Sequence, residues 1–145
     1  MDYRKEYEKW LASPALSEDE RAELRALEGN DKEIKARFYG PLEFGTAGLR
    51  GTMYTGLHNM NRHVIRWATQ GFANVIRAEG TEAMQKGVAV CMDCRNHSAE
   101  FARETACVMA ANGIHVRLFE SLRPTPELSF AVREYGCQAG VNVTA

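Results

Sequence analysis

The sequence lacks a long hydrophobic run, an excess of charge of one sign and a signal peptide. No apolar run approaches the roughly 18 residues of a transmembrane helix, and the N-terminus MDYRKEYEKW is charged from its second residue onward. The formal net charge is −1, so any anion site must be local, because the chain has no general attraction to nucleic acid or anionic lipid. We therefore expect a cytoplasmic protein with neither nucleic acid nor a membrane as its partner.

The sequence also lacks a disulfide framework and a metal-binding pattern. Its four cysteines are Cys91, Cys94, Cys107 and Cys137, and a chain of 145 residues can bury a core without disulfide bonds. The CxxC of Cys91 and Cys94 loosely resembles a redox dithiol, but Cys91 continues an apolar run and does not begin a helix, where its pKa would be lowered. The histidines show no metal-ligand spacing, and a structural zinc site needs four ligands. Thiol chemistry is therefore the weaker alternative, and no metal ligand is expected in this chain.

The composition divides the chain into two predicted parts. Residues 1–40 are rich in both acidic and basic side chains, and their apolar residues recur at helical spacing. A capping box at Ser17 and Glu20 and a start signal at Asn30 predict three short helices. We expect residues 1–40 to form a helical arm whose charged faces are solvated and carry no chemistry. Residues 41–145 are expected to form one domain.

The sequence pattern of residues 41–145 predicts strands that alternate with helices. The glycine-rich residues 44–53 favour two short extended segments joined by a bend. Asn61 opens a long helix with a buried stripe that includes Val64, Val75 and Ile76. From residue 87 onward, strand, helix, strand, helix and strand follow one another, with Ser98 and Thr125 as the expected helix caps. This order predicts an α/β fold: a three-layer αβα sandwich with a mainly parallel mixed sheet, preceded by the helical arm.

Charged residues follow the predicted parallel strands at the points where those strands end. Asp93 and Arg95 come after the first strand, Arg123 after the second, and Thr144 lies at the end of the third. Ligands of open α/β sheets bind beyond the carboxyl ends of the strands, so we expect these residues to lie near a site. The plainer alternative is a structural ion pair between Asp93 and Arg95 and a solvated Arg123.

One motif, EFGTAGLRG at residues 43–51, combines three glycines with a single arginine. Glycines at this spacing allow positive φ angles and a close approach of a ligand to the backbone, and successive exposed amides form an anion-binding concavity. Arg50 adds a planar fork that binds two phosphate oxygens. The motif is neither the Walker pattern nor the dinucleotide fingerprint. The alternative is an ordinary hairpin with a surface arginine.

Several segments taken together resemble a known family. The segments LEFGTAGLRG, NMNRHVIRWATQGFANVI, VAVCMDCRNHSAEFARETACVMAANGIHVRLFES, RPTPELSFAVREYG and GVNVTA are similar, in this order, to the first domain of the α-D-phosphohexomutases. The motif EFGTAGLRG, with its phenylalanine, is most similar to that of the phosphoglucomutase and phosphopentomutase branch. The resemblance covers residues 41–145, and the preceding helical arm is typical of that branch.

The resemblance implies a role for each candidate residue. Arg50 corresponds to the arginine that contacts the phosphorylated serine and the bisphosphate intermediate. Gly45, Thr46 and Gly48 shape the phosphate-binding loop around it. Asp93, Arg95 and Thr144 are supporting residues. In the family the catalytic serine follows the VTA motif, so it is expected directly after Ala145, and no catalytic nucleophile is present in this chain.

The implied reaction moves phosphate between C1 and C6 of a hexose, or C1 and C5 of a pentose, through a phosphoserine and a sugar bisphosphate. The family's Mg²⁺ ligands and its sugar-binding residues lie in later domains, so the implied partners are sugar phosphates and the remaining mutase domains. We expect the fragment alone to be inactive, and the motifs do not distinguish glucose, pentose and mannose. The alternative is a non-catalytic phosphate-binding α/β module, and the codons that follow Ala145 distinguish the two.

Overall fold

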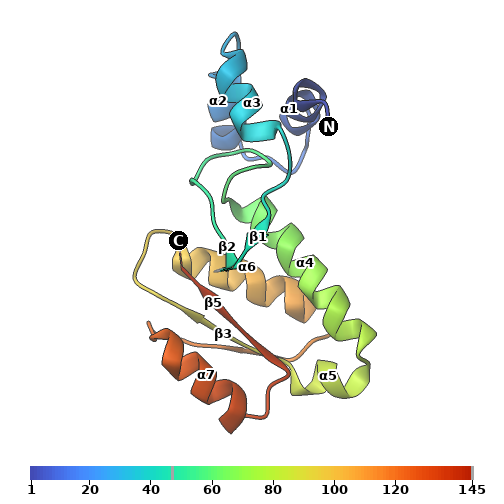
Figure 1. Ribbon diagram of the computed structural model, residues 1–145, viewed down its shortest axis with the longest axis vertical. Helices are drawn as coiled ribbons and strands as arrows, with labels where there is room; N and C mark the ends of the chain where they lie inside the picture. Colours follow the sequence, from blue (N-terminus) through green and yellow to red (C-terminus); the bar gives the residue numbers. More distant parts are fainter. Residues whose placement is uncertain (47, 145) are drawn as a thin grey trace. The chain divides into compact units, whose positions relative to one another are not determined.

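The computed structural model describes residues 1–46 and 48–144. The chain divides into two compact units, Met1–Val64 and Ile65–Ala145, and the division falls within the first turn of helix α4 (Arg62–Ala78). Each unit is described by itself (Figure 1). Ala145, after which the serine is expected, lies outside the described residues.

The first unit begins with three short helices: α1 (Tyr3–Leu11), α2 (Glu18–Arg25) and α3 (Asp31–Phe38). Each follows a side chain that accepts a hydrogen bond from a backbone N–H group of the first turn: Asp2, Ser17 and Asn30. Such caps satisfy donors that have no partner within the helix. The predicted capping box of Ser17 and Glu20 is present, and the prediction of three short helices is confirmed.

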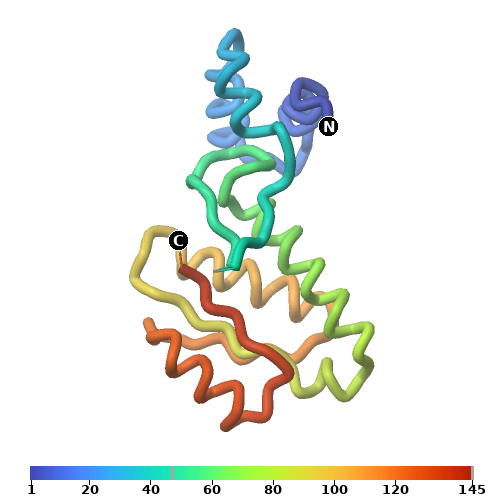
Figure 2. The backbone as a smooth tube through the Cα atoms, in the orientation of Figure 1, coloured from blue at the N-terminus to red at the C-terminus, as the bar shows by residue number. Residues whose placement is uncertain are grey.

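A loop residue completes the core of these helices. The buried cluster contains residues from the arm and Leu57, which comes from the segment after the glycine-rich motif: Leu16, Leu24, Leu27, Ile34, Phe38 and Leu57. Between Phe38 and Leu57 in the sequence, the chain forms an antiparallel hairpin of β1 (Phe44–Gly45) and β2 (Gly48–Leu49). Figure 2 traces the chain from α3 through this hairpin and back toward α4. The two predicted extended segments are therefore confirmed.

The second unit is an α/β structure. After α4 it contains α5 (Thr81–Lys86), β3 (Val88–Met92), α6 (Ser98–Ala111), β4 (Val116–Leu118), α7 (Thr125–Glu134) and β5 (Ala139–Val143). The three strands form a parallel sheet in the order β4-β3-β5. Helices α6 and α7 cover opposite faces of this sheet (Figure 1). Because successive side chains of a strand point to opposite faces, β3 buries Ala89 and Cys91 against Leu128 of α7.

This arrangement confirms the predicted α/β class, with helices on both faces of a parallel sheet and a helical segment before it. In the described residues the larger sheet is entirely parallel, and the antiparallel pair is the separate hairpin of the first unit. The proposed boundary between an arm of residues 1–40 and a domain of residues 41–145 stays a prediction.

Three local predictions are wrong. Val75 is 57% exposed, because it lies about 100° around the helix from the buried Ile76. Ser98 is the first helical residue after His97, and its hydroxyl donates to Asp93 at 2.7 Å and does not cap the helix. Thr125 is likewise inside α7, which Pro124 precedes. In both cases a tertiary partner, a carboxylate or an amide, holds the hydroxyl group.

A fourth correction concerns the arm. Its charged residues were expected on solvated faces, but the side chain of Arg37 is only 8% exposed. Burial of a guanidinium requires paired carboxylates around it, and Arg37 has two of them, Glu23 and Glu33.

Gly87, directly before β3, provides a stability test. Both Gly80 (φ 99°, ψ −177°) and Gly87 (φ 71°, ψ −161°) occupy a backbone region that only glycine adopts readily. A Cβ at Gly87 would lie 2.1 Å from the carbonyl oxygen of His115, whereas a Cβ at Gly80 would meet nothing within 4 Å. We predict that Gly80→Ala lowers the free energy of unfolding by about 1–3 kcal/mol.

Gly87→Ala should lower that free energy by more than about 4 kcal/mol, because a backbone clash adds to the same strain. Urea denaturation measures both values. Equal losses for the two variants would contradict the packing described for the start of β3.

Candidate functional site

The glycine-rich hairpin uses its glycines for different reasons. Gly48 has a φ of 93°, which favours glycine, whereas Gly45 and Gly51 have no positive φ. Gly51 is needed for space: a Cβ there would lie 3.1 Å from Leu42 Cδ2 and 3.3 Å from the backbone nitrogen of Met60. Thr46 lies in the turn and is exposed. The hairpin is therefore closely packed at its base, next to Arg50, and open at its tip.

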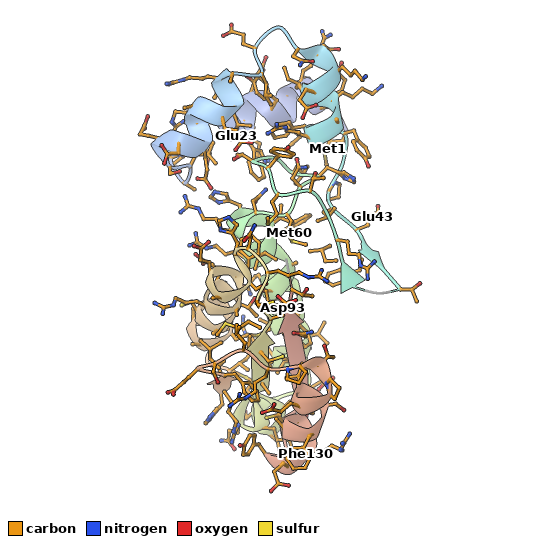
Figure 3. All side chains as sticks on the ribbon, turned by 90° about the vertical axis from the view of Figure 1, so that its left-hand side faces the viewer. Met1, Glu23, Glu43, Met60, Asp93 and Phe130 are labelled. Carbon is orange, nitrogen blue, oxygen red and sulfur yellow. The ribbon has the colours of Figure 1, made fainter. Side chains whose placement is uncertain are left out.

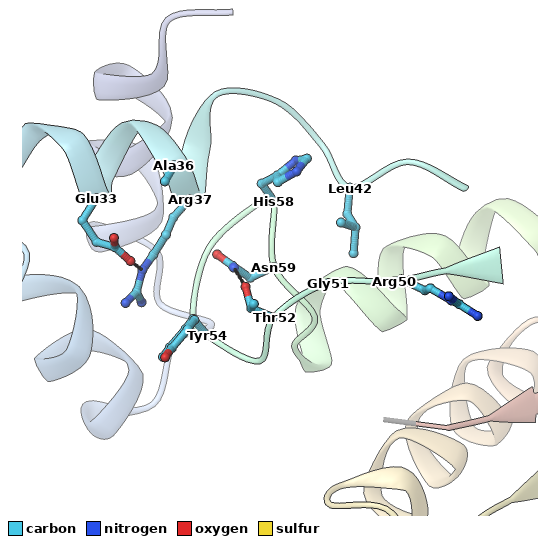
Figure 4. A pocket seen from close by; sticks show the side chains of 10 residues that line it. All are labelled: Glu33, Ala36, Arg37, Leu42, Arg50, Gly51, Thr52, Tyr54, His58 and Asn59. Carbon is cyan, nitrogen blue, oxygen red and sulfur yellow. Dashed lines mark hydrogen bonds and ion pairs between the residues drawn. The ribbon is translucent and has the colours of Figure 1, made fainter. Parts of the chain in front are cut away.

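Arg50 is an exposed cation that has no partner in the part of the chain that the structure describes. Among residues 1–46 and 48–144 its side chain makes no hydrogen bond or ion pair, and it is exposed. It borders a cavity of about 400 Å³ that is also lined by Arg37, Thr52, Tyr54, His58 and Asn59. Figure 4 shows the Arg50 guanidinium pointing away from the Arg37 side of this cavity. Its donors are thus available to an anion.

In the second unit, Asp93 gathers hydrogen-bond donors at the end of β3, where Figure 3 labels it. Its Oδ1 accepts from the Ser98 hydroxyl at 2.7 Å and from the backbone N–H of Arg95 at 3.0 Å. Its Oδ2 lies 3.5 Å from Nε of Arg95, and the side chain of Thr144 hydrogen-bonds to the same carboxylate. One carboxylate therefore connects the loop after β3, the start of α6 and the end of β5.

These contacts set the charge state of Asp93. Burial raises its pKa, but the hydrogen bonds from Thr144, Ser98 and the Arg95 backbone, together with the Arg95 charge, outweigh burial and hold the pKa below its usual range. Asp93 is consequently ionised at neutral pH, and its carboxylate accepts hydrogen bonds from several donors. It is suited to hold the loop in place, and it is not suited to accept a proton.

Two arginines lie near this edge, and they differ in availability. The side chain of Arg95 is 66% exposed and borders a cavity of about 260 Å³ that His97 and Leu122 also line. The backbone N–H of Arg123 donates to the carbonyl of Met92 at 3.1 Å, which places Arg123 beside the end of β3. Its Nε pairs with Glu127 at 2.8 Å, and both side chains are 42% exposed, so Arg123 is solvated, as the plainer alternative expects.

Two polar residues of this edge were not foreseen. The sequence predicts a helix cap at Ser98, although a hydroxyl five positions after an aspartate also fits a contact with that carboxylate. Asn142 of β5 donates to Thr125 Oγ1 at 2.6 Å and accepts from Cys91 Sγ at 3.2 Å. It joins β5 to both α7 and β3, and no sequence pattern indicated this role.

The cysteines are free thiols in different environments. Cys91 is buried, and Cys94 is exposed. Burial raises the pKa of the Cys91 thiol, and the negative charges of Asp93 and Glu127 raise it further. A reactive dithiol needs a lowered pKa, so the geometry disfavours redox chemistry at this pair.

The predicted site residues thus form two groups. Asp93, Arg95 and Thr144 come together at the end of β3 and β5 in the second unit. Arg50, Thr46, Gly45 and Gly48 belong to the hairpin of the first unit. Whether the two groups form one site stays a prediction.

Neither a metal centre nor a membrane segment is found in the described part of the chain. Residues 1–46 and 48–144 contain no group of three histidine, cysteine, aspartate or glutamate side chains that could hold a metal ion. None of the helices formed by these residues has the length and apolar character needed to cross a bilayer.

Comparison with known proteins gives the family. Residues 41–145 match the model of phosphoglucomutase/phosphomannomutase, alpha/beta/alpha domain I. The chain is 38% identical over 124 residues to the phosphopentomutase of Homo sapiens, covering 81% of this chain and 20% of that protein. It is 37% identical over 115 residues to the phosphoglucomutase of Staphylococcus saprophyticus, covering 79% and 20%. No solved structure matches it.

A third relative extends over nearly the whole sequence. The phosphomannomutase of Mycoplasma pneumoniae is 32% identical over 142 residues, covering 97% of this chain and 26% of that protein. The chain belongs to the phosphoglucomutase/phosphomannomutase family, and residues 41–145 correspond to its first α/β/α domain. It spans about a fifth to a quarter of the length of these curated relatives.

The lowered pKa of Asp93 predicts a defined pH dependence. A carboxylate with a depressed folded-state pKa adds stability that is present above its unfolded-state pKa and is lost as the pH falls through its folded-state pKa. We predict that Asp93→Asn removes part of the acid sensitivity of unfolding and lowers stability at neutral pH. Urea denaturation between neutral and acid pH measures this difference.

The matched control is Glu134→Gln, at an exposed carboxylate without an ion pair among the described residues. It should leave the acid sensitivity unchanged. If Asp93→Asn and Glu134→Gln gave the same pH profile, the donors around Asp93 would not have the energetic role assigned to them.

Proposed function

We propose that this chain carries the phosphate-holding first domain of a phosphosugar mutase, in which Arg50 binds the transferring phosphoryl group. The observation that supports the proposal most strongly is the state of Arg50 itself. It is an exposed guanidinium without a partner among the described residues, on a hairpin of a recognised mutase domain. An unpaired arginine beside exposed backbone amides is suited to a dianionic ligand.

The proposed reaction proceeds in two displacements. A phosphoserine, expected directly after Ala145, donates its phosphate to a sugar monophosphate. The resulting bisphosphate then returns its other phosphate to the serine. A covalent phospho-donor divides one difficult transfer into two steps, and fixed cations stabilise the charge on the phosphoryl oxygens. Arg50 supplies such a cation, with Thr46, Gly45 and Gly48 forming the loop that presents it.

The second group of residues has a supporting role in this proposal. Asp93 is saturated with hydrogen bonds from Ser98, Arg95 and Thr144, and so it fixes the end of β5 from which the serine would extend. The exposed Arg95 leaves a second guanidinium at that edge.

Other components are placed outside this chain. Mg²⁺, when bound, supplies positive charge to the phosphoryl group, and we place its ligands in later domains, as the resemblance to the family implies. The partners are sugar phosphates, a sugar bisphosphate as intermediate and the remaining mutase domains. We propose a cytoplasmic location, in keeping with the phosphorylated metabolites that the reaction uses.

Replacement of Arg50 tests the proposal. In a chain that continues through the expected serine and the later domains, Arg50→Ala should lower kcat for a sugar 1-phosphate at least about tenfold, because it removes charge-assisted hydrogen bonds to the phosphoryl group. Thermal unfolding should be unchanged, since Arg50 is exposed and makes no hydrogen bond or ion pair among the described residues. Steady-state kinetics with glucose 1-phosphate and ribose 1-phosphate, in the presence of glucose 1,6-bisphosphate, measures the effect.

The control is Arg103→Ala, at an exposed arginine of α6 that also lacks a partner among residues 1–46 and 48–144. It should keep wild-type turnover. Wild-type turnover of Arg50→Ala would remove the proposed role of the hairpin.

A further inference from the structure

The N-terminal helices contact the segment that carries Arg50 through a cluster of charged and polar groups around the buried Arg37. We call Arg37, Glu23, Glu33 and Thr55 the Arg37 cluster. Arg37 Nε donates to Glu33 Oε1 at 2.9 Å (Figure 4), and its Nη1 donates to Glu23 Oε1. Two helices, α2 and α3, are therefore joined at one guanidinium.

The same cluster binds a loop that lies beyond the hairpin in the sequence. Glu23 accepts hydrogen bonds from the backbone N–H of Thr55, at 3.2 Å, and from its hydroxyl. Nη1 of Arg37 lies 3.4 Å from the carbonyl oxygen of Thr55, and its guanidinium lies 4.4 Å from the centre of the Tyr54 ring. Thr55 thus has its N–H, its hydroxyl and its carbonyl held by two side chains of the arm.

From this loop, a short series of contacts leads to Arg50. The backbone N–H of His58 donates to the carbonyl of Arg37 at 2.9 Å. Next along the chain, Asn59 Nδ2 donates to Thr52 Oγ1 at 2.8 Å, and the N–H of Met60 donates to the carbonyl of Thr52 at 2.8 Å. Thr52 is therefore held twice, and it lies two residues from Arg50.

The arm also holds the far end of the segment. Glu20 of α2 pairs with Arg62 at 2.7 Å and lies 3.1 Å from His63 Nε2, at the start of α4. Leu57 enters the hydrophobic core of the arm. Consequently the segment of residues 41–61 is held by the arm at its middle and just beyond its end, while Arg50 remains free to bind.

We infer that the N-terminal helices are a positioning element for Arg50 and that Arg37 is the positioning residue, acting through Glu23 and Thr55. This inference rests on the phosphate-binding role proposed for Arg50. It assigns a function to the arm, whose charged residues otherwise predict only a solvated surface. We assign Arg37 a positioning role because its Nε and Nη1 donors already bind Glu33, Glu23 and the carbonyl of Thr55.

Thr55→Val tests the link without leaving the Arg37 charge unpaired. It removes the hydroxyl that donates to Glu23 and keeps the volume of the side chain. Thr69→Val is the matched control: Thr69 is also buried, 7% exposed against 4% for Thr55, and its hydroxyl hydrogen-bonds to Thr105 in the second unit. Arg37→Lys, which retains the charge but not the planar fork, gives an intermediate step.

The 145-residue chain is labelled with ¹⁵N, and amide hydrogen exchange is measured at Met60 and Leu42, whose N–H groups bond within the segment. Thr55→Val should accelerate exchange at Met60 by about fivefold or more, the effect of one lost buried hydrogen bond. The exchange rate at Ile34, inside α3, should change much less. In Thr69→Val, the exchange rates at Met60, Leu42 and Ile34 should also change much less. Arg37→Lys should accelerate Met60 exchange as well.

Titration with inorganic phosphate, followed at Arg50 Nε, completes the test. Thr55→Val and Arg37→Lys should weaken phosphate binding by about threefold or more, and Thr69→Val should not. If Thr55→Val accelerated amide exchange equally at Ile34 and Met60, Thr55 would only stabilise the unit as a whole. If Thr55→Val and Arg37→Lys both behaved like the wild type, the Arg37 cluster would not be linked to the Arg50 segment. Either result overturns the inference. If wild-type Arg50 does not respond to phosphate but Met60 exchange rises, the proposed function fails and the positioning of the hairpin stands.

Discussion

The first unit depends on the hydrogen bonds that the Glu23 carboxylate accepts from another helix and from a loop. This carboxylate accepts hydrogen bonds from the Arg37 guanidinium and from the backbone N–H and the hydroxyl of Thr55. The same carboxylate therefore neutralises a buried cation and provides the hydrogen-bond acceptor for a backbone N–H of the loop. Removing one partner of a fully buried pair typically costs about 3–5 kcal/mol, and the cost here is smaller because the Glu23 side chain is 36% exposed and solvent screens its charge. The helices and the loop after the hairpin therefore fold as one body around this group.

Asp93 has the corresponding position in the second unit. It too is a single carboxylate that collects loop donors, in this case from Ser98, Arg95 and Thr144. In both units an anion holds the loop in place while an arginine nearby stays exposed: Arg50 on the hairpin and Arg95 at the end of β3. This division of roles suits an anion site. It holds for Arg50, which has no partner among the described residues, and only in part for Arg95, whose Nε also pairs with Asp93.

The sequence predicted the elements whose signals are local. The capping box of Ser17, the cap at Asn30 and the alternation of strands after residue 87 depend on neighbours in the sequence, and each produced the expected helix or strand. The resemblance carried by EFGTAGLRG led to the family, because the motif is specific to it. These signals needed no knowledge of which segments meet in space.

The contacts that could not be predicted are those between distant residues. Ser98 and Thr125 have the composition of caps, but a carboxylate and an amide from other elements bind their hydroxyls. Arg37 occurs in a stretch of alternating charge, and only its contacts with Glu23 of α2 and with Thr55, 18 residues further on, show that it is buried. The glycine spacing predicted a loop open to a ligand, whereas a Cβ at Gly51 would be a tight contact, 3.1 Å from Leu42 Cδ2 and 3.3 Å from the backbone nitrogen of Met60.

A crystal structure of the protein with glucose 1,6-bisphosphate bound would test the central claim most directly. The measured quantity is the distance from the Arg50 guanidinium to the nearest phosphate oxygen. Our account predicts a bidentate contact at about 2.7–2.9 Å, with the phosphate also near the backbone of residues 45–48. A bound phosphate held by other residues, with Arg50 still in solvent, would contradict it.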